Sequence, residues 1–189
     1  MAQNKLHVAI ISSPGMGHLV PVLLLANRLA THHHLDTTIL AVTTQTSPAE
    51  SQLLNGSSAH INLIKIPSPD ISSLIHPDDT MVTRLVVIMR EARNGIWSAI
   101  SGMTCRPHVL IGDLFSSESL PIADEVHMPK YVYVPCLARF LALTTYLHVL
   151  DKEVRGQYIE QMEPLRIPGC VPVRGQDVPN FSLLQIHPE

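Results

Sequence analysis

The sequence is poor in charged and aromatic residues and has no long apolar run. Of its 189 residues 15% are charged, and 13 basic and 16 acidic side chains give a formal net charge of −3. No basic stripe runs along the chain, so we expect no nucleic-acid partner. The longest apolar stretches, Leu19–Ala26 and Leu85–Met89, are far shorter than the ~20 residues that a membrane-spanning helix requires. We therefore expect no stable membrane insertion.

Cysteine is scarce and scattered. Cys105, Cys136 and Cys170 are odd in number and include no Cys-x-x-Cys pair, so they are typical of reduced thiols and not of a disulfide framework or a zinc site. The N-terminus enters a strand-like run directly, without the apolar core and cleavage site of a signal peptide. These features predict a cytoplasmic protein. A hydrophobic content of 46% is enough for one ample globular domain.

Strand-like and helix-like segments alternate along the chain. We expect strands at Leu6–Ile11, Thr37–Thr43, Ile61–Ile66, Val109–Ile111 and Tyr131–Val134. We expect helices at His18–Ala30, Pro48–Leu54, Thr80–Ile100, Ser116–Val126 and Arg139–Val149. Strands separated by helices pair in parallel, so the fold class is α/β, a doubly wound parallel sheet with the common order 3-2-1-4-5. The predicted domain covers residues 1–151, and an irregular Pro/Gly-rich tail covers 152–189.

Two loops should meet where this sheet reverses its strand order. One loop, Ser13–His18, follows the first strand, and the other, Gly112–Phe115, follows the fourth. Ligands of such sheets bind beyond the carboxyl ends of the strands at this switch point, and neighbouring strands lie only about 4.8 Å apart. We expect His18 and Asp113 to project into one crevice and to form a hydrogen bond. An imidazole oriented by a carboxylate is suited to take a proton as a general base.

The residue types alone leave a plainer interpretation open. A histidine after a glycine-rich turn is often an ordinary helix-start residue, and an aspartate at a strand end is often a helix N-cap.

Longer matches resemble a known family. Val8–Pro21, with its Pro-Gly-x-Gly-His-Leu-x-Pro core, is similar to the N-terminal motif of plant family 1 UDP-glycosyltransferases. Gly112–Phe115, Leu150–Glu153 and Ile167–Pro172 resemble the branch that glucosylates hydroquinone-like phenols and monolignols. The resemblance covers roughly residues 6–180. It implies a GT-B glycosyltransferase, whose N-terminal Rossmann-like domain binds the acceptor, with His18 as the base and Asp113 as its orienting carboxylate.

The implied reaction is one inverting displacement. His18 takes the proton of a phenolic small-molecule acceptor, the oxygen attacks the anomeric carbon of the sugar, and UDP leaves. Gly17 gives the acceptor close access to the backbone, and four side chains are candidate walls of an apolar acceptor pocket: Leu114, Phe115, Met81 and Tyr146. The resemblance implies no cofactor and no metal, since the UDP-sugar is a co-substrate.

The chain also departs from the family pattern. The family's second domain carries a signature, rich in Trp, His, Gly, Glu and Gln, that binds the uridine diphosphate, and nothing here resembles it: the single tryptophan is Trp97. We therefore expect a truncated form with negligible transferase activity alone, using a UDP-sugar only if a C-terminal domain is supplied. Pro135–Ala138 replaces the small hydroxyl residues that relatives often place after the fifth strand, and Phe181–Glu189 does not resemble the family's continuation.

Four other interpretations compete with this one. A dinucleotide-binding oxidoreductase is disfavoured because Val20 stands where a third glycine is needed, and a serine hydrolase because the chain has no Gly-x-Ser-x-Gly elbow. The side chains of consecutive helical residues point in different directions, so those of His32-His33-His34 cannot converge on one metal ion. The triplet instead predicts a helix C-terminus. A non-catalytic remnant that binds phenolic ligands or a partner protein stays open.

Overall fold

The computed structural model describes residues 5–44, 48–56 and 60–178. The chain divides into two compact units, Met1–Tyr133 and Val134–Glu189. The two units meet between Tyr133 and Val134, before the helix expected at Arg139–Val149. The domain boundary that we expected after residue 151 stays a prediction. Phe181–Glu189, where we expected a departure from the family, lies outside the described residues.

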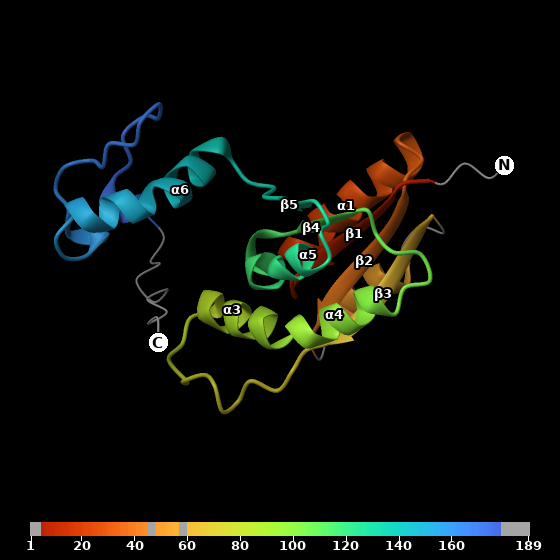
Figure 1. Cartoon of the computed structure of the whole chain (residues 1–189). Coiled ribbons are helices and arrows are strands. Elements are labelled where there is room, and N and C mark those ends of the chain that lie inside the picture. Colours follow the sequence, from red (N-terminus) through yellow and green to blue (C-terminus); the bar gives the residue numbers. More distant parts are fainter. Residues whose placement is uncertain (1–4, 45–47, 57–59, 179–189) are drawn as a thin grey trace. The chain divides into compact units, whose positions relative to one another are not determined.

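Five parallel strands form the sheet of the first unit (Figure 1). They are β1 (His7–Ser12), β2 (Asp36–Thr43), β3 (Ile61–Pro67), β4 (Val109–Gly112) and β5 (Lys130–Val132). Their order across the sheet is β3-β2-β1-β4-β5, so the predicted doubly wound topology is confirmed. In the central strand, Ile10 is in register with Ile39 of β2 and Ile111 of β4. The strand order reverses between β1 and β4, as expected.

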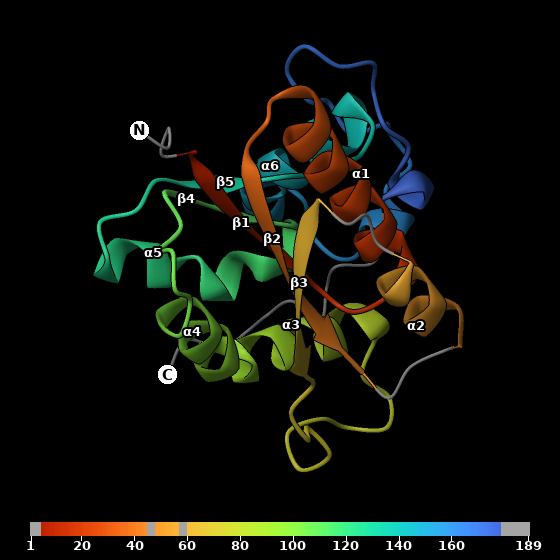
Figure 2. The same cartoon turned by 90° about the vertical axis from the view of Figure 1, so that its right-hand side faces the viewer.

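Helices cover both faces of this sheet (Figure 2). On one face lie α1 (Met16–His32) and α2 (Pro48–Asn55), and on the other α3 (Met81–Glu91), α4 (Arg93–Ser101) and α5 (Pro121–Glu125). Because side chains alternate along a strand, Val8 and Ile10 pack with α1, while Ala9 and Ile11 pack with α3 and α4. Ile10 and Ile11 are completely buried, which explains the continuous apolar run that predicted β1. Burial of such a side chain stabilises the fold by roughly 1.5–3 kcal/mol.

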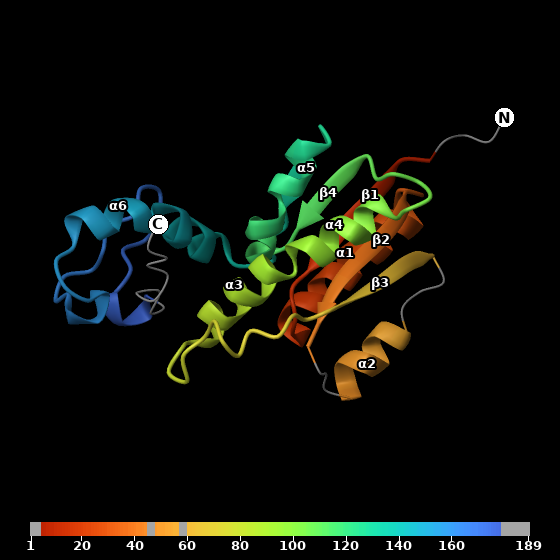
Figure 3. The ribbon, with the colours of Figure 1, turned by 60° about the horizontal axis from the view of Figure 1, so that its bottom comes forward.

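The prediction of one long helix over Thr80–Ile100 is wrong, because the segment forms two helices. The chain forms α3 and α4 with a break at Ala92, whose ψ of −9° departs from the helical value (Figure 3). Beyond the break α4 packs tightly on β3, since a β-carbon at Gly95 would stand only 3.0 Å from Ile66 Cγ2. Apolar periodicity continues through the break because both helices bury residues in the same core.

The helix expected at Ser116–Val126 also consists of two pieces. A 3₁₀-helix, η1 (Leu114–Ser119), is followed by α5, which starts at Pro121. A proline has no N–H to donate to the preceding turn but is favoured at the first position of a helix, which is where Pro121 stands in α5. The expectation that α1 ends in the histidine triplet is confirmed, because His32 is its last residue.

The second unit is built around α6 (Ala138–Glu153). Short 3₁₀ turns, η2 (Tyr158–Glu160) and η3 (Gly175–Asp177), follow it. Its core consists of Leu143, Leu150, Leu165, Ile167 and Val173. The Tyr158 hydroxyl donates a hydrogen bond to the Asp151 carboxylate, and burial together with this bond raises the pKa of Tyr158. Across the described ranges no helix combines the length and apolarity needed to cross a membrane.

Gly112, at the end of β4, gives the first testable consequence of the packing. A β-carbon there would lie 2.8 Å from Ser116 Cβ and 3.2 Å from Leu120 Cδ2. Gly112→Ala should therefore destabilise the first unit by about 1–3 kcal/mol, as overpacking of a tight site does. Urea unfolding followed by the fluorescence of Trp97, which packs against the core of this unit, measures the change.

The matched control is Gly17→Ala, because a β-carbon at Gly17 meets no atom within 4 Å. That variant should be as stable as the parent chain or slightly more stable, since alanine favours a helix over glycine. Equal stability of the two variants would contradict the proposed close packing at the end of β4.

Candidate active site

His18 lies in the first turn of α1, immediately beyond β1. The turn that leads to it contains Gly15 at φ +105°, a backbone conformation that glycine adopts without a steric penalty. The N–H of His18 donates to the Gly15 carbonyl at 3.0 Å, so the start of the helix holds the residue. Its imidazole packs edge-on against Phe115, with ring centroids 5.1 Å apart and an interplanar angle of 82°. The side chain is 28% exposed and is therefore accessible to a ligand.

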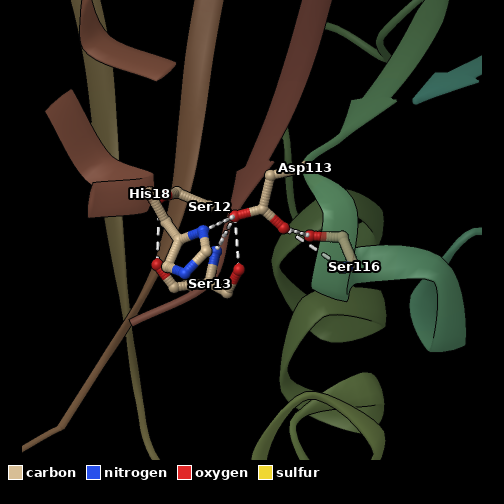
Figure 4. A network of polar contacts seen from close by, with 5 residues as sticks. All are labelled: Ser12, Ser13, His18, Asp113 and Ser116. Atoms are coloured by element: carbon tan, nitrogen blue, oxygen red, sulfur yellow. Dashed lines mark hydrogen bonds and ion pairs between the residues drawn. The ribbon is translucent and has the colours of Figure 1, made fainter. Parts of the chain in front are cut away.

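Asp113 follows β4 directly and is almost completely buried, at 2% exposure. Its Oδ1 accepts hydrogen bonds from Ser116 N at 3.1 Å and from Ser116 Oγ at 2.6 Å, which makes Asp113 the N-cap of η1. Its Oδ2 accepts from Ser13 N at 2.7 Å and from the Ser13 hydroxyl. Four donors, two from the loop after β1 and two from η1, therefore satisfy one buried carboxylate (Figure 4).

The structure brings His18 and Asp113 together, but not as a hydrogen-bonded pair. Nδ1 of His18 lies 3.9 Å from Oδ2 of Asp113 (Figure 4), which is too long for a hydrogen bond. The predicted hydrogen bond is therefore wrong, and the predicted proximity is correct. The physical reason is that Ser13 supplies both donors to the oxygen that faces the imidazole.

The imidazole still has the arrangement that a general base requires. Its Nδ1 faces a carboxylate, so electrostatic attraction favours a proton on Nδ1. Within the described part of the chain, Nε2 on the opposite side of the ring has no hydrogen-bond partner. A neutral imidazole with its proton on Nδ1 can accept a second proton at Nε2.

The other predicted site residues differ in how the structure places them. Phe115 contacts His18, and Leu114 beside it is half-buried. Met81, at the first position of α3, is 71% exposed, and Gly17 is also exposed with open space above its backbone. Tyr146 lies in the second unit and packs against the core of that unit. Their roles as acceptor-binding residues stay predictions.

Sequence reasoning missed Ser13 and Ser116. Ser13, in the predicted turn, is 1% exposed, and Ser116 is completely buried. A signal for Ser116 was present, because an Asp-x-x-Ser sequence at a helix start is typical of N-capping. No comparable local signal marks Ser13, whose partner is 100 positions away in the sequence.

Comparison with known proteins shows which sequences and folds the chain resembles. No protein-family model matches the chain. Curated relatives do: anthocyanidin 3-O-glucosyltransferase 5 of Manihot esculenta is 47% identical over 177 residues, which are 93% of this chain and 36% of that protein. UDP-glycosyltransferase 72E2 of Arabidopsis thaliana is 41% identical over 185 residues, 98% of this chain and 38% of that protein. Over nearly its whole length the chain fits the N-terminal part of plant UDP-glycosyltransferases.

Solved structures of UDP-glycosyltransferases share the fold. TcCGT1 in complex with UDP superposes with a TM-score of 0.81 and 40% identity, over 93% of this chain and 38% of that one. Phytolacca americana UGT2 complexed with UDP-2fluoro-glucose and pterostilbene superposes with a TM-score of 0.85 and 28% identity, over 94% of this chain and 41% of that one. The parallel sheet with flanking helices is the N-terminal Rossmann-like domain of the GT-B fold.

The chain matches only the N-terminal part of these UDP-glycosyltransferases. It spans 36–38% of the length of the curated relatives named above. The expected truncated form is consistent with this coverage.

Proposed function

We propose that this chain provides the acceptor-binding half and the catalytic base of a UDP-sugar-dependent O-glycosyltransferase. The observation that supports the proposal most directly is the convergence of His18 and Asp113, from the loops after β1 and β4, at a separation of 3.9 Å. In doubly wound sheets the carboxyl ends of strands at the switch point are where ligands bind. His18 is also the accessible member of the pair, because Asp113 is buried.

The proposed reaction is an inverting displacement at the anomeric carbon. Nε2 of His18 takes the proton of the acceptor hydroxyl as the acceptor oxygen forms its bond to the anomeric carbon. The bond from that carbon to the UDP oxygen breaks, and UDP leaves with the electron pair. The imidazolium formed at His18 is compensated by the nearby carboxylate of Asp113. No cofactor takes part, and the UDP-sugar is the second substrate.

The acceptor that suits this site is a small phenol. A phenolic hydroxyl titrates near pH ~10, so it needs only moderate assistance from a base. Phe115 touches the base and Leu114 and Met81 are apolar, which fits an aromatic ligand beside His18. A relative is named for glucosylating anthocyanidins, and a structural neighbour was solved with pterostilbene. We also propose glucose as the sugar and a role in plant phenolic metabolism, and the names of the same relatives support both.

The proposed compartment is the cytoplasm. All three cysteines are free in the structure, and Cys105 and Cys136 are exposed. Exposed free thiols are typical of a reducing environment.

The experiment that tests the proposal joins this chain to the C-terminal part of a relative. In the hybrid, residues 1–178 replace the matching N-terminal segment of UDP-glycosyltransferase 72E2, which is 41% identical over this region. We expect the hybrid to transfer glucose from UDP-glucose to monolignols or hydroquinone, and we expect the chain alone to show negligible transfer.

Calorimetry of the chain alone with the same phenols distinguishes the remaining alternative. Acceptor binding without any transfer by the hybrid would favour a non-catalytic phenol-binding remnant. A hybrid that folds and binds UDP but neither binds nor glucosylates phenols would refute the proposed function.

A further inference from the structure

The hydroxyl of Ser13 donates to the same oxygen of Asp113 that faces the imidazole of His18. A carboxylate offers about four lone-pair sites, two on each oxygen. Ser116 occupies both sites of Oδ1 with its N–H and hydroxyl, and Ser13 occupies both sites of Oδ2 in the same way. A hydrogen bond from Nδ1 of His18 therefore requires one of these four donors to leave or to share its site.

Of these four donors, only the Ser13 hydroxyl both binds Oδ2, the oxygen that faces His18, and can rotate away from it. The two donors of Ser116 are on Oδ1, away from the imidazole. The N–H of Ser13 is part of the backbone, which two hydrogen bonds fix in place. The N–H donates to Asp113 Oδ2 at 2.7 Å, and the Ser13 carbonyl accepts from the Ser12 hydroxyl at 3.2 Å. The Ser13 hydroxyl, in contrast, can rotate among staggered positions about its Cα–Cβ bond.

We propose that Ser13 is a positioning residue whose hydroxyl occupies Oδ2 of Asp113 while His18 is neutral and yields that oxygen to Nδ1 when His18 becomes protonated. This rests on the proposed function of His18 as the base. Nδ1 must then approach Oδ2 by about 1 Å, from 3.9 Å to the 2.7–2.9 Å of a charge-assisted hydrogen bond. Asp113 keeps its hydrogen bonds from the Ser13 N–H and from the N–H and hydroxyl of Ser116, so the carboxylate stays in position.

The exchange is directional because of charge. A hydrogen bond from an imidazolium to a carboxylate is roughly twice as strong as one from a neutral donor. Neutral His18 therefore does not displace the hydroxyl, whereas protonated His18 does. An interaction that forms only as the acceptor proton moves to Nε2 stabilises the transition state more than the ground state, which is the condition for a higher turnover rate.

Nuclear magnetic resonance of the chain with ¹⁵N-labelled histidine tests this exchange without any substrate. The chain has 11 histidines, and a His18→Gln variant assigns the His18 ring signals. In the wild type, we expect the Nδ1–H proton of the imidazolium form to be shifted downfield and to exchange with water about tenfold more slowly than in the neutral form. In Ser13→Ala, the neutral form should already show this slowed, downfield signal, since Oδ2 is then available. A tenfold factor corresponds to a bond of about 1.4 kcal/mol.

Ser119→Ala is the matched control. Ser119, on η1, is buried like Ser13, but its hydroxyl donates to the Met89 carbonyl at 3.4 Å and not to Asp113. It should reproduce the wild-type spectrum. A neutral-form signal in Ser13→Ala identical to that of Ser119→Ala would overturn the proposal.

The wild type decides the question if Ser13→Ala fails to fold. The proposal is then overturned if imidazolium formation in the wild type leaves the Nδ1 proton exchanging as fast as in the neutral form. The measurement also stands apart from the proposed function, because loss of transfer in the hybrid enzyme leaves the ring signals of His18 in the chain unchanged.

Discussion

His18→Ala is expected to lower the transfer rate of the hybrid enzyme by about 10²–10⁴-fold, the usual contribution of general-base catalysis. The loss should fall mainly on kcat, because the imidazole contributes by accepting a proton in the transition state. Initial rates of UDP release, with a phenol as the acceptor, measure both kcat and KM. The affinity for UDP-glucose should not change, since the proposed donor site belongs to the other half.

His32→Ala is the control for this experiment. His32 ends the same helix, is exposed, and lies about four turns from His18 along α1. The control should retain the full rate. Should His18→Ala transfer glucose as fast as His32→Ala, His18 would not be the base, and the acceptor would have to be deprotonated elsewhere.

Asp113→Ala is expected to destabilise the first unit by about 3 kcal/mol or more. The substitution removes the acceptor of four hydrogen bonds and leaves two N–H groups and two hydroxyls, of Ser13 and Ser116, without it in a buried site. An unsatisfied buried donor costs about 1–3 kcal/mol, and partial relaxation keeps the total below the sum. Urea unfolding monitored by Trp97 fluorescence measures the loss of stability in the first unit.

Asp124→Ala provides the comparison with an exposed aspartate. The Asp124 side chain is 63% exposed and forms a surface ion pair with Lys130, an interaction that typically contributes less than about 1 kcal/mol. A similar loss of stability in both variants would show that the four hydrogen bonds to Asp113 do not stabilise the unit. A large difference between them would also explain why Asp113 variants need a folding check before any rate is compared.

The predicted role of Asp113 and its plainer interpretation turn out to be compatible. The residue is the N-cap of η1, as an aspartate after a strand often is, and its other oxygen faces His18. Capping uses Oδ1 and leaves Oδ2 directed at the loop after β1. One carboxylate can therefore start a helix and accompany a base at the same time.

Sequence patterns were sufficient to predict features that depend on local side-chain periodicity or on chain topology. Ile10 and Ile11 lie in an uninterrupted apolar run because β1 is buried on both faces, and this predicted a central parallel strand. Alternation of strands and helices then restricted the order of the sheet, and the order placed the loops of His18 and Asp113 side by side. Patterns were insufficient at Ala92, where both helices share one apolar periodicity and only the approach of α4 to β3 reveals the break.

The sequence by itself determined the fold class, the resemblance to a family and the neighbourhood of the two candidate catalytic residues, because each depends on periodicity, on motif order or on which strand ends are adjacent. Only the tertiary structure decided which donors the Asp113 carboxylate accepts. That choice depends on differences of about 1 Å in the distances from Asp113 to its neighbours, of which Ser13 is 100 positions away in the chain. Hydrogen-bond strength falls steeply over such differences in distance. Local spacing indicates only the Ser116 cap, so at Oδ2 the sequence predicted a hydrogen bond from the imidazole where the folded chain has one from Ser13.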